Sequence, residues 1–417
     1  MHKIERLLQT LAPKGVEFKT LEEVFEIKNG YTPSKNNPEF WEKGTIPWFR
    51  MEDIRENGRI LKDSIQHITP KALKNKKLFP KNSIIISTTA TIGEHALLIV
   101  DSLANQRFTF LSKKANCDIA LDMKFFFYQC FLLGEWCKKN TNVSGFASVD
   151  MTAFKKYKFP IPPLEIQQEI VKILDAFTEL NTELNTELKA RKKQYQYYQN
   201  MLLDFKDINS NHQDAKERLV QKTYPKRLKT LLQTLAPKGV EFRKLGEVCD
   251  FQKGKSITKK AVTFGKVPVI SGGRQPAYYH NEANRSGETI AISSSGVYAG
   301  YVSYWDIPVF LADSFSVSPK QKTLMPKYLF HYLTTQQDAI HATKSTGGIP
   351  HVYSKDLQNF LIPIPPLEIQ QEIVKILDQF LALTTDLLAG IPAEIEARKK
   401  QYEYYREKLL AFKPLKA

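Results

Sequence analysis

The chain has 417 residues, with 60 lysines and arginines against 44 aspartates and glutamates, which leaves a net charge of +16. This length is too great for one compact core and suits two domains, while the charge favours a polyanionic partner such as nucleic acid or an anionic membrane surface. The most apolar run, Phe125 to Leu133, is much shorter than the roughly 20 residues of a spanning helix, which disfavours a membrane protein.

The chain opens on a short amphipathic segment that lacks the apolar core and cleavage site of a secretory signal. This opener is the first of three segments that recur later in the chain. The order is a short opener, a variable insert and a long helical block, and then the same three again. Because the repeated segments mix many residue types, they indicate a duplicated frame within which the inserts, 19–159 and 243–362, have diverged. The repeats are LLQTLAPKGVEF at Leu7–Phe18 and Leu231–Phe242, PIPPLEIQQEIVKILD at Pro160–Asp175 and Pro363–Asp378, and ARKKQY from Ala190 and from Ala397.

Each insert is predicted to be an α+β domain, because short strand-like runs precede one helix. Both inserts have the same order of elements, which predicts two versions of one fold. The helix of the first insert carries Phe126, Cys130, Leu133 and Cys137 on one face. The predicted strands are 83–87, 95–100 and 107–111, then 289–293, 300–305 and 309–317, and the predicted helices are 122–139 and 327–343.

Polar, glycine-rich loops with basic and aromatic residues lie between these strands, and such side chains reach phosphates and base edges. Asn and Gln can bond adenine and Arg can bond guanine, so Asn105, Gln106, Arg107, Arg274 and Gln275 are predicted to be the sharpest base readers. The alternative for each is a loop cap or a surface contact. The other candidate DNA-binding residues are Lys28, Tyr31, Thr32, Ser87, Thr88, Thr89, Ser144 and Gly145, then Lys253, Lys255, Ser256, Gly273, Ser294, Ser295, Tyr298, Gly347 and Gly348.

Each helical block begins after a proline-rich segment and then carries apolar residues at alternating spacings of four and three, as in a coiled-coil seam. The pattern shifts phase at Leu188 in the first block, and Gly390-Ile391-Pro392 predicts a kink in the second. We expect the two blocks to pack on each other in antiparallel orientation; the alternative is that each packs only on its own domain. The seam residues are Ile166, Ile170, Ile173, Phe177, Leu180 and Leu184, then Ile369, Ile373, Ile376, Phe380, Leu383 and Leu387.

Basic triplets follow in both blocks, at 191–193 and 398–400, and are interpreted as a solvated helix face, with a phosphate contact as the alternative. The polar stretch Asp207–Arg218 has few apolar residues to bury and is predicted to link the halves. The predicted divisions are a first domain with its opener at 1–159, a central helix at 160–206, a linker at 207–222, a second domain at 223–362 and a C-terminal helix at 363–417.

Motifs for catalysis are missing from the sequence. The one near match to a phosphate-binding loop, Gly254-Lys255-Ser256, has Cys249 where the first glycine is needed. Neither Ile161-Pro162-Pro163-Leu164 nor Asn37-Pro38-Glu39-Phe40 forms the Pro-Pro-aromatic tetrapeptide of amino-type adenine methylases. The four cysteines form no CxxC pair, which points to reduced thiols in a cytoplasm rather than to a zinc site. The chain is therefore predicted to be non-catalytic, with no metal or cofactor of its own.

The repeated PIPPLEIQQEIVKIL, each time followed by a long helix and separated by a variable domain, resembles the specificity subunit of type I restriction-modification enzymes. The resemblance covers essentially the whole chain. It implies an α+β fold with two target recognition domains separated by two long antiparallel coiled-coil helices in a pseudo-twofold internal repeat. It also implies that each insert reads one half of a split, asymmetric double-stranded DNA site, while the helices set the spacer.

The same resemblance implies partners. Two modification subunits would carry S-adenosylmethionine, and restriction subunits would hydrolyse ATP with Mg and cut DNA, so those cofactors belong to the partners. Two other interpretations are open: a fused restriction-methylation enzyme whose catalytic part is missing, and a coiled-coil adaptor that binds only proteins. The first needs methylase motifs, and the aromatic and basic loops disfavour the second.

Overall fold

The chain folds into two compact units in a computed structural model that describes residues 2–74, 77–142, 147–209, 214–320, 322–345, 348–385 and 390–415. Unit 1 comprises residues 1–183 and 396–417, and unit 2 comprises residues 184–395. Each unit therefore holds the opener, the insert and the first part of the helical block of one repeat. Each unit also contains the last part of the helical block of the other repeat.

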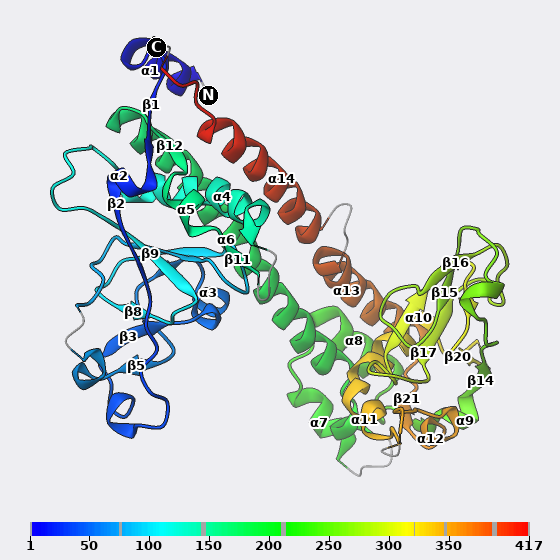
Figure 1. The fold of residues 1–417 in the computed structure, drawn as a ribbon. Helices are drawn as coiled ribbons and strands as arrows, with labels where there is room; N and C mark the ends of the chain where they lie inside the picture. Colours follow the sequence, from blue (N-terminus) through cyan, green and yellow to red (C-terminus); the bar gives the residue numbers. More distant parts are fainter. Residues whose placement is uncertain are drawn as a thin grey trace. The chain divides into compact units, whose positions relative to one another are not determined.

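Unit 1 is an α+β structure built on short strands (Figure 1). Its strands are β1 (Glu17–Thr20), β2 (Phe25–Asn29), β3 (Ile46–Phe49), β4 (Ile60–Leu61), β5 (His67–Ile68), β6 (Ile84–Ser87), β7 (His95–Leu98), β8 (Leu103–Ala104), β9 (Phe108–Lys113), β10 (Thr141–Asn142), β11 (Ser148–Val149) and β12 (Lys158–Ile161). Its helices are α1 (His2–Leu11), α2 (Leu21–Val24), η1 (Pro38–Phe40), α3 (Met51–Asn57), η2 (Pro70–Leu73), α4 (Met123–Lys139), α5 (Met151–Lys155), the first part of α6 (Leu164–Leu203) and most of α14 (Ile391–Leu410). The main sheets have the orders β2-β9-β6-β7-β4 and β5-β3-β8.

The predicted strands and helix of the first insert are confirmed as β6, β7, β9 and α4. Helix α4 begins where the Asp122 carboxylate accepts the N–H groups of Lys124 and Phe125, at 2.7 and 3.2 Å. Its predicted apolar face is buried, and it lies in one core with the inward residues of β6 and β9. Antiparallel pairing of β1 with β12 joins the opener to the start of the helical block.

Unit 2 repeats this architecture. Its strands are β13 (Phe242–Lys244), β14 (Cys249–Lys253), β15 (Val267–Ile270), β16 (Tyr278–His280), β17 (Thr289–Ser293), β18 (Val302–Trp305), β19 (Phe310–Leu311), β20 (Ser314–Pro319) and β21 (Leu361–Pro363). Its helices are η3 (Lys206–Ile208), α7 (Ala215–Gln221), α8 (Lys226–Leu235), α9 (Leu245–Val248), η4 (Lys259–Ala261), α10 (Pro326–Thr335), α11 (Gln337–Ala342), α12 (Ser354–Leu357) and α13 (Leu367–Thr385), with the second part of α6. The main sheets have the orders β14-β20-β17-β18 and β16-β15-β19.

Two predicted elements of the second insert are each divided in the structure. The run 309–317 forms β19 and β20, which belong to different sheets, because the chain changes sheet at Ala312, whose N–H bonds Ile270 O at 2.7 Å. The predicted helix 327–343 forms α10 and α11. Gln337, at the start of α11, bonds Val302 N and Gly300 O at 3.2 and 2.7 Å, so tertiary contacts direct the second helix.

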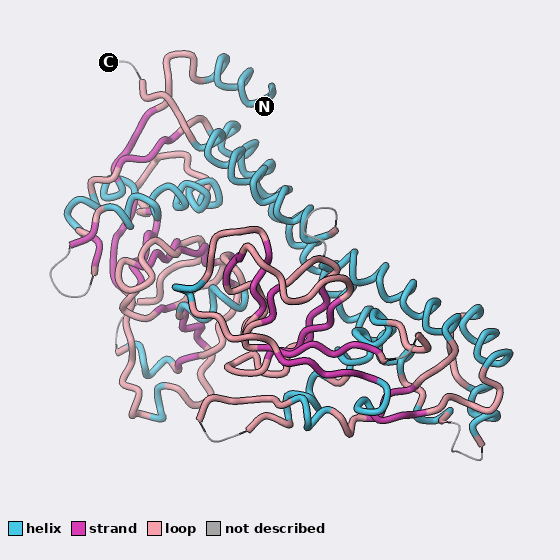
Figure 2. Tube along the Cα trace, turned by 90° about the vertical axis from the view of Figure 1, so that its right-hand side faces the viewer, coloured by secondary structure: helices cyan, strands magenta, loops and turns pink. Residues whose placement is uncertain are grey.

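The helical blocks pack in antiparallel orientation within each unit, as predicted (Figures 1 and 2). Helix α6 is continuous over 40 residues, whereas the second block is divided into α13 and α14 at the predicted Gly-Ile-Pro kink. In unit 1 the Phe177 ring of α6 stacks on Tyr405 of α14, with centroids 5.5 Å apart. In unit 2 Tyr198 of α6 stacks on Phe380 of α13 at 5.0 Å. Phe177 and Phe380 occupy the same position of the repeat, and so do Tyr198 and Tyr405. The two units therefore make the same contact.

The predicted seam is divided between two kinds of packing. Ile166 and Ile170 are fully buried in the core of unit 1, and Ile369 and Ile373 in that of unit 2. The start of each block thus packs on its own domain, and the aromatic residues one or two turns later reach the other block. Ile173, Leu180 and Ile376 are half-buried, Leu184 is buried, and Leu387 lies outside the described residues.

Leu383 departs from the predicted seam, since its side chain is 38% exposed while the next residue, Thr384, is buried.

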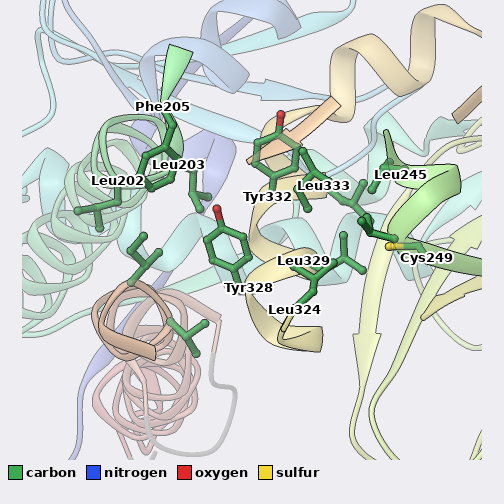
Figure 3. Packing of buried hydrophobic residues seen from close by; sticks show 14 of the residues in the cluster. Leu202, Leu203, Phe205, Leu245, Cys249, Leu324, Tyr328, Leu329, Tyr332 and Leu333 are labelled. Carbon is green, nitrogen blue, oxygen red and sulfur yellow. The ribbon is translucent and has the colours of Figure 1, made fainter. Parts of the chain in front are cut away.

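The core of unit 2 extends to the end of α6 (Figure 3). There Leu202, Leu203 and Phe205 face Tyr328 of α10, and all four side chains are buried. The predicted linker contains η3 and α7. In the part of the chain that the structure describes, no helix is long and apolar enough to cross a membrane.

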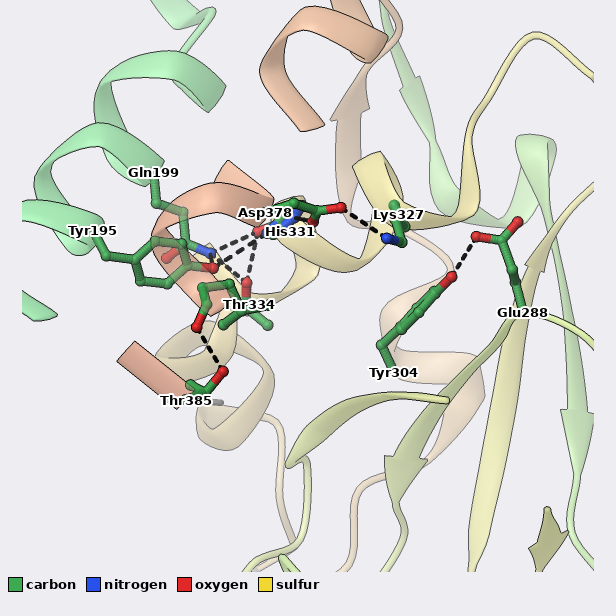
Figure 4. A network of polar contacts seen from close by, with 10 residues as sticks. Tyr195, Gln199, Glu288, Tyr304, Lys327, His331, Thr334, Asp378 and Thr385 are labelled. Carbon is green, nitrogen blue, oxygen red and sulfur yellow. Dashed lines mark hydrogen bonds and ion pairs between the residues drawn. The ribbon is translucent and has the colours of Figure 1, made fainter. Parts of the chain in front are cut away.

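Matching polar contacts fix the helical blocks to the inserts in both units. Lys124 and Lys327 form ion pairs with Asp175 and Asp378 at 2.6 and 2.7 Å. Tyr128 donates its hydroxyl to Asp175 at 2.6 Å, and His331 takes the equivalent place 2.8 Å from Asp378. In unit 2 this contact extends through Tyr195, Gln199 and Thr334 to helix α6 (Figure 4).

Candidate nucleic-acid interface

Three of the predicted loops converge at one edge of the five-stranded sheet of unit 1. The loop after β2 is held on the loop before β9, because Gly30 and Tyr31 donate their N–H groups to Phe108 O and Ala104 O at 2.9 and 2.7 Å. A Cβ at Gly30 would lie 2.2 Å from Asn105 O, so only glycine permits this approach. The Thr32 hydroxyl also donates to Gln106 Oε1. Candidate residues from separate loops therefore share one surface.

The predicted readers of unit 1 differ in how free their side chains are. Asn105 Oδ1 accepts the Arg107 N–H at 3.0 Å, so this amide shapes the turn. Gln106 and Arg107 are exposed. Thr32, Asn105, Gln106 and Arg107 line a cavity of about 350 Å³. Asn105 therefore caps the loop, which was the alternative to base reading, whereas the side chain of Arg107 is available to a ligand.

Ser87 and Thr88 are buried, in contrast to the expectation that they contact DNA. Ser87 Oγ donates to Thr89 O at 2.7 Å, and the hydroxyls of Thr88 and Thr109 lie 3.0 Å apart. These buried hydroxyls therefore stabilise the loop instead of facing solvent. Ala90, just beyond, has a φ of 61°, a left-handed conformation that costs energy for a residue with a Cβ. Ser144 and Gly145 lie outside the described residues.

Basic residues that the sequence analysis did not select join this surface. Lys35, Arg50 and Arg55 line the same cavity, and the Arg50 guanidinium lies 6.0 Å from the centre of the Trp48 ring. Asp53 fixes the local backbone by accepting the N–H groups of Arg50 and Ile65, both at 2.6 Å. Lys35 comes from the loop after β2, whereas Arg50 and Arg55 come from the loop and short helix after β3. Their only sequence signal was their charge.

Unit 2 places the equivalent loops in the same way. Gly254 donates its N–H to Ser314 O at 2.8 Å and Lys255 to Leu311 O at 2.9 Å, while the side chains of Lys253, Lys255 and Ser256 are exposed. Arg285 holds this strand end, with its guanidinium bonded to the carbonyls of Gln252 and Lys253, each at 3.1 Å. Burial lowers the pKa of Arg285 below its usual value. Arg285 is therefore a positioning residue that the sequence analysis missed.

Arg274 and Tyr298 form a cation–π pair on the candidate surface of unit 2. The Arg274 guanidinium lies 4.8 Å from the centre of the Tyr298 ring and 5.6 Å from that of Tyr301, which fixes the cation over aromatic faces. Gln275 is exposed beside it, and a Cβ at Gly273 would be in ordinary van der Waals contact, 3.5 Å from Gln275 O. A guanidinium held in this manner keeps donors available to a phosphate or a guanine edge.

Ser294 and Ser295 hold neighbouring loops together. Ser294 receives the Val352 N–H at 2.9 Å and gives its own N–H to Asp313 O at 3.0 Å, and the Ser295 hydroxyl donates to the Asp313 carboxylate. Asp313 was not predicted; a carboxylate can accept a hydrogen bond from cytosine but repels phosphate. Gly348 is exposed with a φ of 87°, and Gly347 lies outside the described residues.

The described residues include no group of three or more His, Cys, Asp or Glu side chains suited to hold a metal ion. Burial raises the pKa of the Cys137 and Cys249 thiols to about 12, so both are protonated at neutral pH and poor nucleophiles. The surfaces described above therefore combine cations, amides, hydroxyls and aromatic rings, a composition that binds polyanions.

Comparison with known proteins gives a consistent result. The family model described as the type I restriction modification DNA specificity domain matches residues 13–194 and 237–397. The chain is 40% identical over 402 residues to the EcoprrI specificity subunit of Escherichia coli, covering 93% of each chain. It is 32% identical over 308 residues to the EcoR124I/EcoR124II specificity subunit of Escherichia coli, covering 66% of this chain and 69% of that one.

Solved structures match the fold over nearly the whole chain. The S subunit of a type I restriction-modification system from M. genitalium aligns with a TM-score of 0.58 at 19% identity, covering 95% of this chain and 96% of that one. A chain from a study of complex assembly and conformational transition of the type I R-M system aligns with a TM-score of 0.55 at 18% identity, covering 95% and 97%.

Proposed function

Because this chain belongs to the family of type I restriction-modification specificity subunits, we propose that each of its units reads one half of a bipartite, asymmetric DNA site. Members of the family are non-catalytic components of their systems, and so is this chain. In the proposal, unit 1 reads one half-site through Gln106 and Arg107, and unit 2 reads the other through Arg274 and Gln275.

One observation carries this proposal: the two units keep the same frame and change the loops. Gln167 bonds Asp122 N, Ala120 O and Pro162 O, and Gln370 makes the equivalent bonds to Met325 N, Thr323 O and Pro365 O, all between 2.7 and 2.9 Å. The candidate loops keep equivalent backbone positions but differ in their side chains: Thr91, for example, stands where unit 2 has Val297. A constant frame with divergent polar loops is expected of two readers with different targets.

The helical blocks have two proposed roles: they set the spacer between the half-sites and dock the modification subunits. Support for the first is the continuity of α6, which contributes residues to both units. S-adenosylmethionine, ATP and Mg are proposed to bind the modification and restriction subunits, in keeping with a chain that lacks the corresponding sequence motifs.

The deciding experiment exchanges residues 243–362 for the insert of a relative and sequences the methylated sites in cells that carry the complete system. One half of the methylated sequence should change and the other should stay the same. A four-residue insertion in α6 near Leu184 should instead change the spacer, because it adds about one turn, roughly 6 Å of rise. An exchanged insert that altered both half-sites would contradict the proposal.

A further inference from the structure

An apolar groove of unit 1 lies between the opener and the C-terminal segment. It has a volume of about 670 Å³ and is lined by Leu8, Ala12, Val16 and Phe412, with Lys14 and Lys413 among the other lining residues. Val16 donates its N–H to Lys413 O and accepts that of Leu415, both at 3.0 Å, so the groove has a fixed backbone wall. Both lysines are exposed.

Unit 2 contains the same groove in a filled form. By the repeat, Leu232 corresponds to Leu8, and Phe205 and Ile208 correspond to Phe412 and Leu415. Leu232, Phe205 and Ile208 are fully buried, whereas Leu8 and Phe412 are half-buried and Leu415 is 49% exposed. The same apolar positions are therefore covered in one unit and open in the other.

Helix α7 makes the difference in unit 2. It contacts η3 and α8, and its Leu219 is buried in one cluster with Phe205, Ile208 and Leu232. Tyr224, just after α7, donates its hydroxyl to Asp204 O at 3.1 Å. A short amphipathic helix is thus the segment that fits this groove.

The charges at the two grooves differ. In unit 2 Lys222 lies 2.8 Å from Asp207 and 3.8 Å from Asp204, and Lys229 caps the carbonyl of Val220 at 2.6 Å. The corresponding residues of unit 1 are Pro414, Ala411 and Glu5. The unit 1 groove therefore lacks the two acids that hold Lys222, the residue that follows α7, and it has Lys14 and Lys413 on its lining.

We propose that the unit 1 groove binds a short amphipathic helix of a partner polypeptide, with an apolar face like that of α7 and carboxylates where α7 carries lysines. One such helix binds per chain, because α7 occupies the equivalent groove of unit 2. The site differs from the loops proposed to read DNA.

The test measures binding of two peptides to the full chain by saturation-transfer NMR. The first peptide is residues 214–225, DAKERLVQKTYP, and the second is the same peptide with Lys216→Glu and Lys222→Glu. The acidic peptide should bind at least about tenfold more tightly, a difference of about 1.4 kcal/mol. Ala12→Glu in the chain should abolish binding, because it places a charge in the groove.

The double variant Lys14→Glu and Lys413→Glu changes only exposed side chains, and it should reverse the preference between the peptides. Leu11→Glu is the matched control, since Leu11 is 41% exposed and its counterpart Leu235 is 40% exposed despite α7. This control should leave binding unchanged. Absence of saturable binding by the acidic peptide would overturn the proposal. So would a concentration-dependent dimer of the chain that Ala12→Glu dissociates, because the occupant would then be a second copy.

Discussion

His331 Nε2 lies 2.8 Å from the carboxylate of Asp378, joining the insert of unit 2 to its helical block. His331 is fully buried, and the other Asp378 oxygen receives Lys327 at 2.7 Å. Burial alone would raise the pKa of Asp378, but the hydrogen bonds from His331 and Lys327 outweigh it and hold this pKa below its usual value.

The lowered pKa of Asp378 predicts an acid-sensitive contribution to stability. A carboxyl group whose pKa is lower in the folded state stabilises the fold above its unfolded pKa, near 3.9, and loses that contribution as the pH falls through the folded value. Urea unfolding at pH 7 and at about pH 3 should show a larger acid loss for the wild type than for Asp378→Asn. Equal acid losses would mean that this carboxylate does not couple folding to protons.

Gln370 should be much more important for stability than its neighbour Gln371. Gln370 is fully buried and makes three hydrogen bonds, so Gln370→Ala leaves Met325 N, Thr323 O and Pro365 O without this partner. The expected loss in the free energy of unfolding is about 2–4 kcal/mol. Gln371 is exposed, and Gln371→Ala in the same helix is the control, with an expected change within about 0.5 kcal/mol.

Phe380 and Leu383 should respond differently to the same substitution, although both were predicted in the seam. Phe380→Asp removes the stacking on Tyr198 and places a charge in the contact between the two helices, and we expect a loss of about 2–4 kcal/mol in the free energy of unfolding. Leu383→Asp should change stability by less than about 1 kcal/mol because its side chain is largely exposed. Thermal unfolding of the two variants gives the comparison, and similar losses would mean that the helices do not pack through Phe380.

Arg107 and Arg274 should act on different half-sites. Loss of a bidentate base contact in Arg107→Ala should cost about 1–3 kcal/mol in DNA binding and relax specificity in one half-site only, with Arg274→Ala affecting the other. Fluorescence anisotropy on the methylated target and on substituted targets measures both effects. Lys35→Ala offers a control on the same surface, because Lys35 lines the cavity with Arg107 and loss of a phosphate contact would weaken binding to all sequences alike. Equal losses on every target for Arg107→Ala would reassign it to phosphate binding.

The duplicated frame, the α+β inserts and the helical blocks could all be predicted from the amino-acid sequence. Exact repeats such as PIPPLEIQQEIVKILD reveal duplication directly, and the spacing of Ile166, Ile170 and Phe177 marks an apolar helix face through local geometry. The loops of the candidate surfaces were also predicted, because glycine and polar residues interrupt the strands.

Which residues share each surface depends on tertiary contacts that the sequence does not reveal. The spacing of apolar residues marks a helix face but does not show whether that face packs on a domain or on a second helix. It therefore did not distinguish Ile170, which is buried against its own domain, from Phe177, which stacks on Tyr405. A loop hydroxyl can likewise face solvent or the sheet, and the pairing of β6 with β9 buried Ser87 and Thr88 while Arg107 stayed exposed. The groove at Phe412 is open although the same apolar position at Phe205 is covered, because α7 packs over it in unit 2.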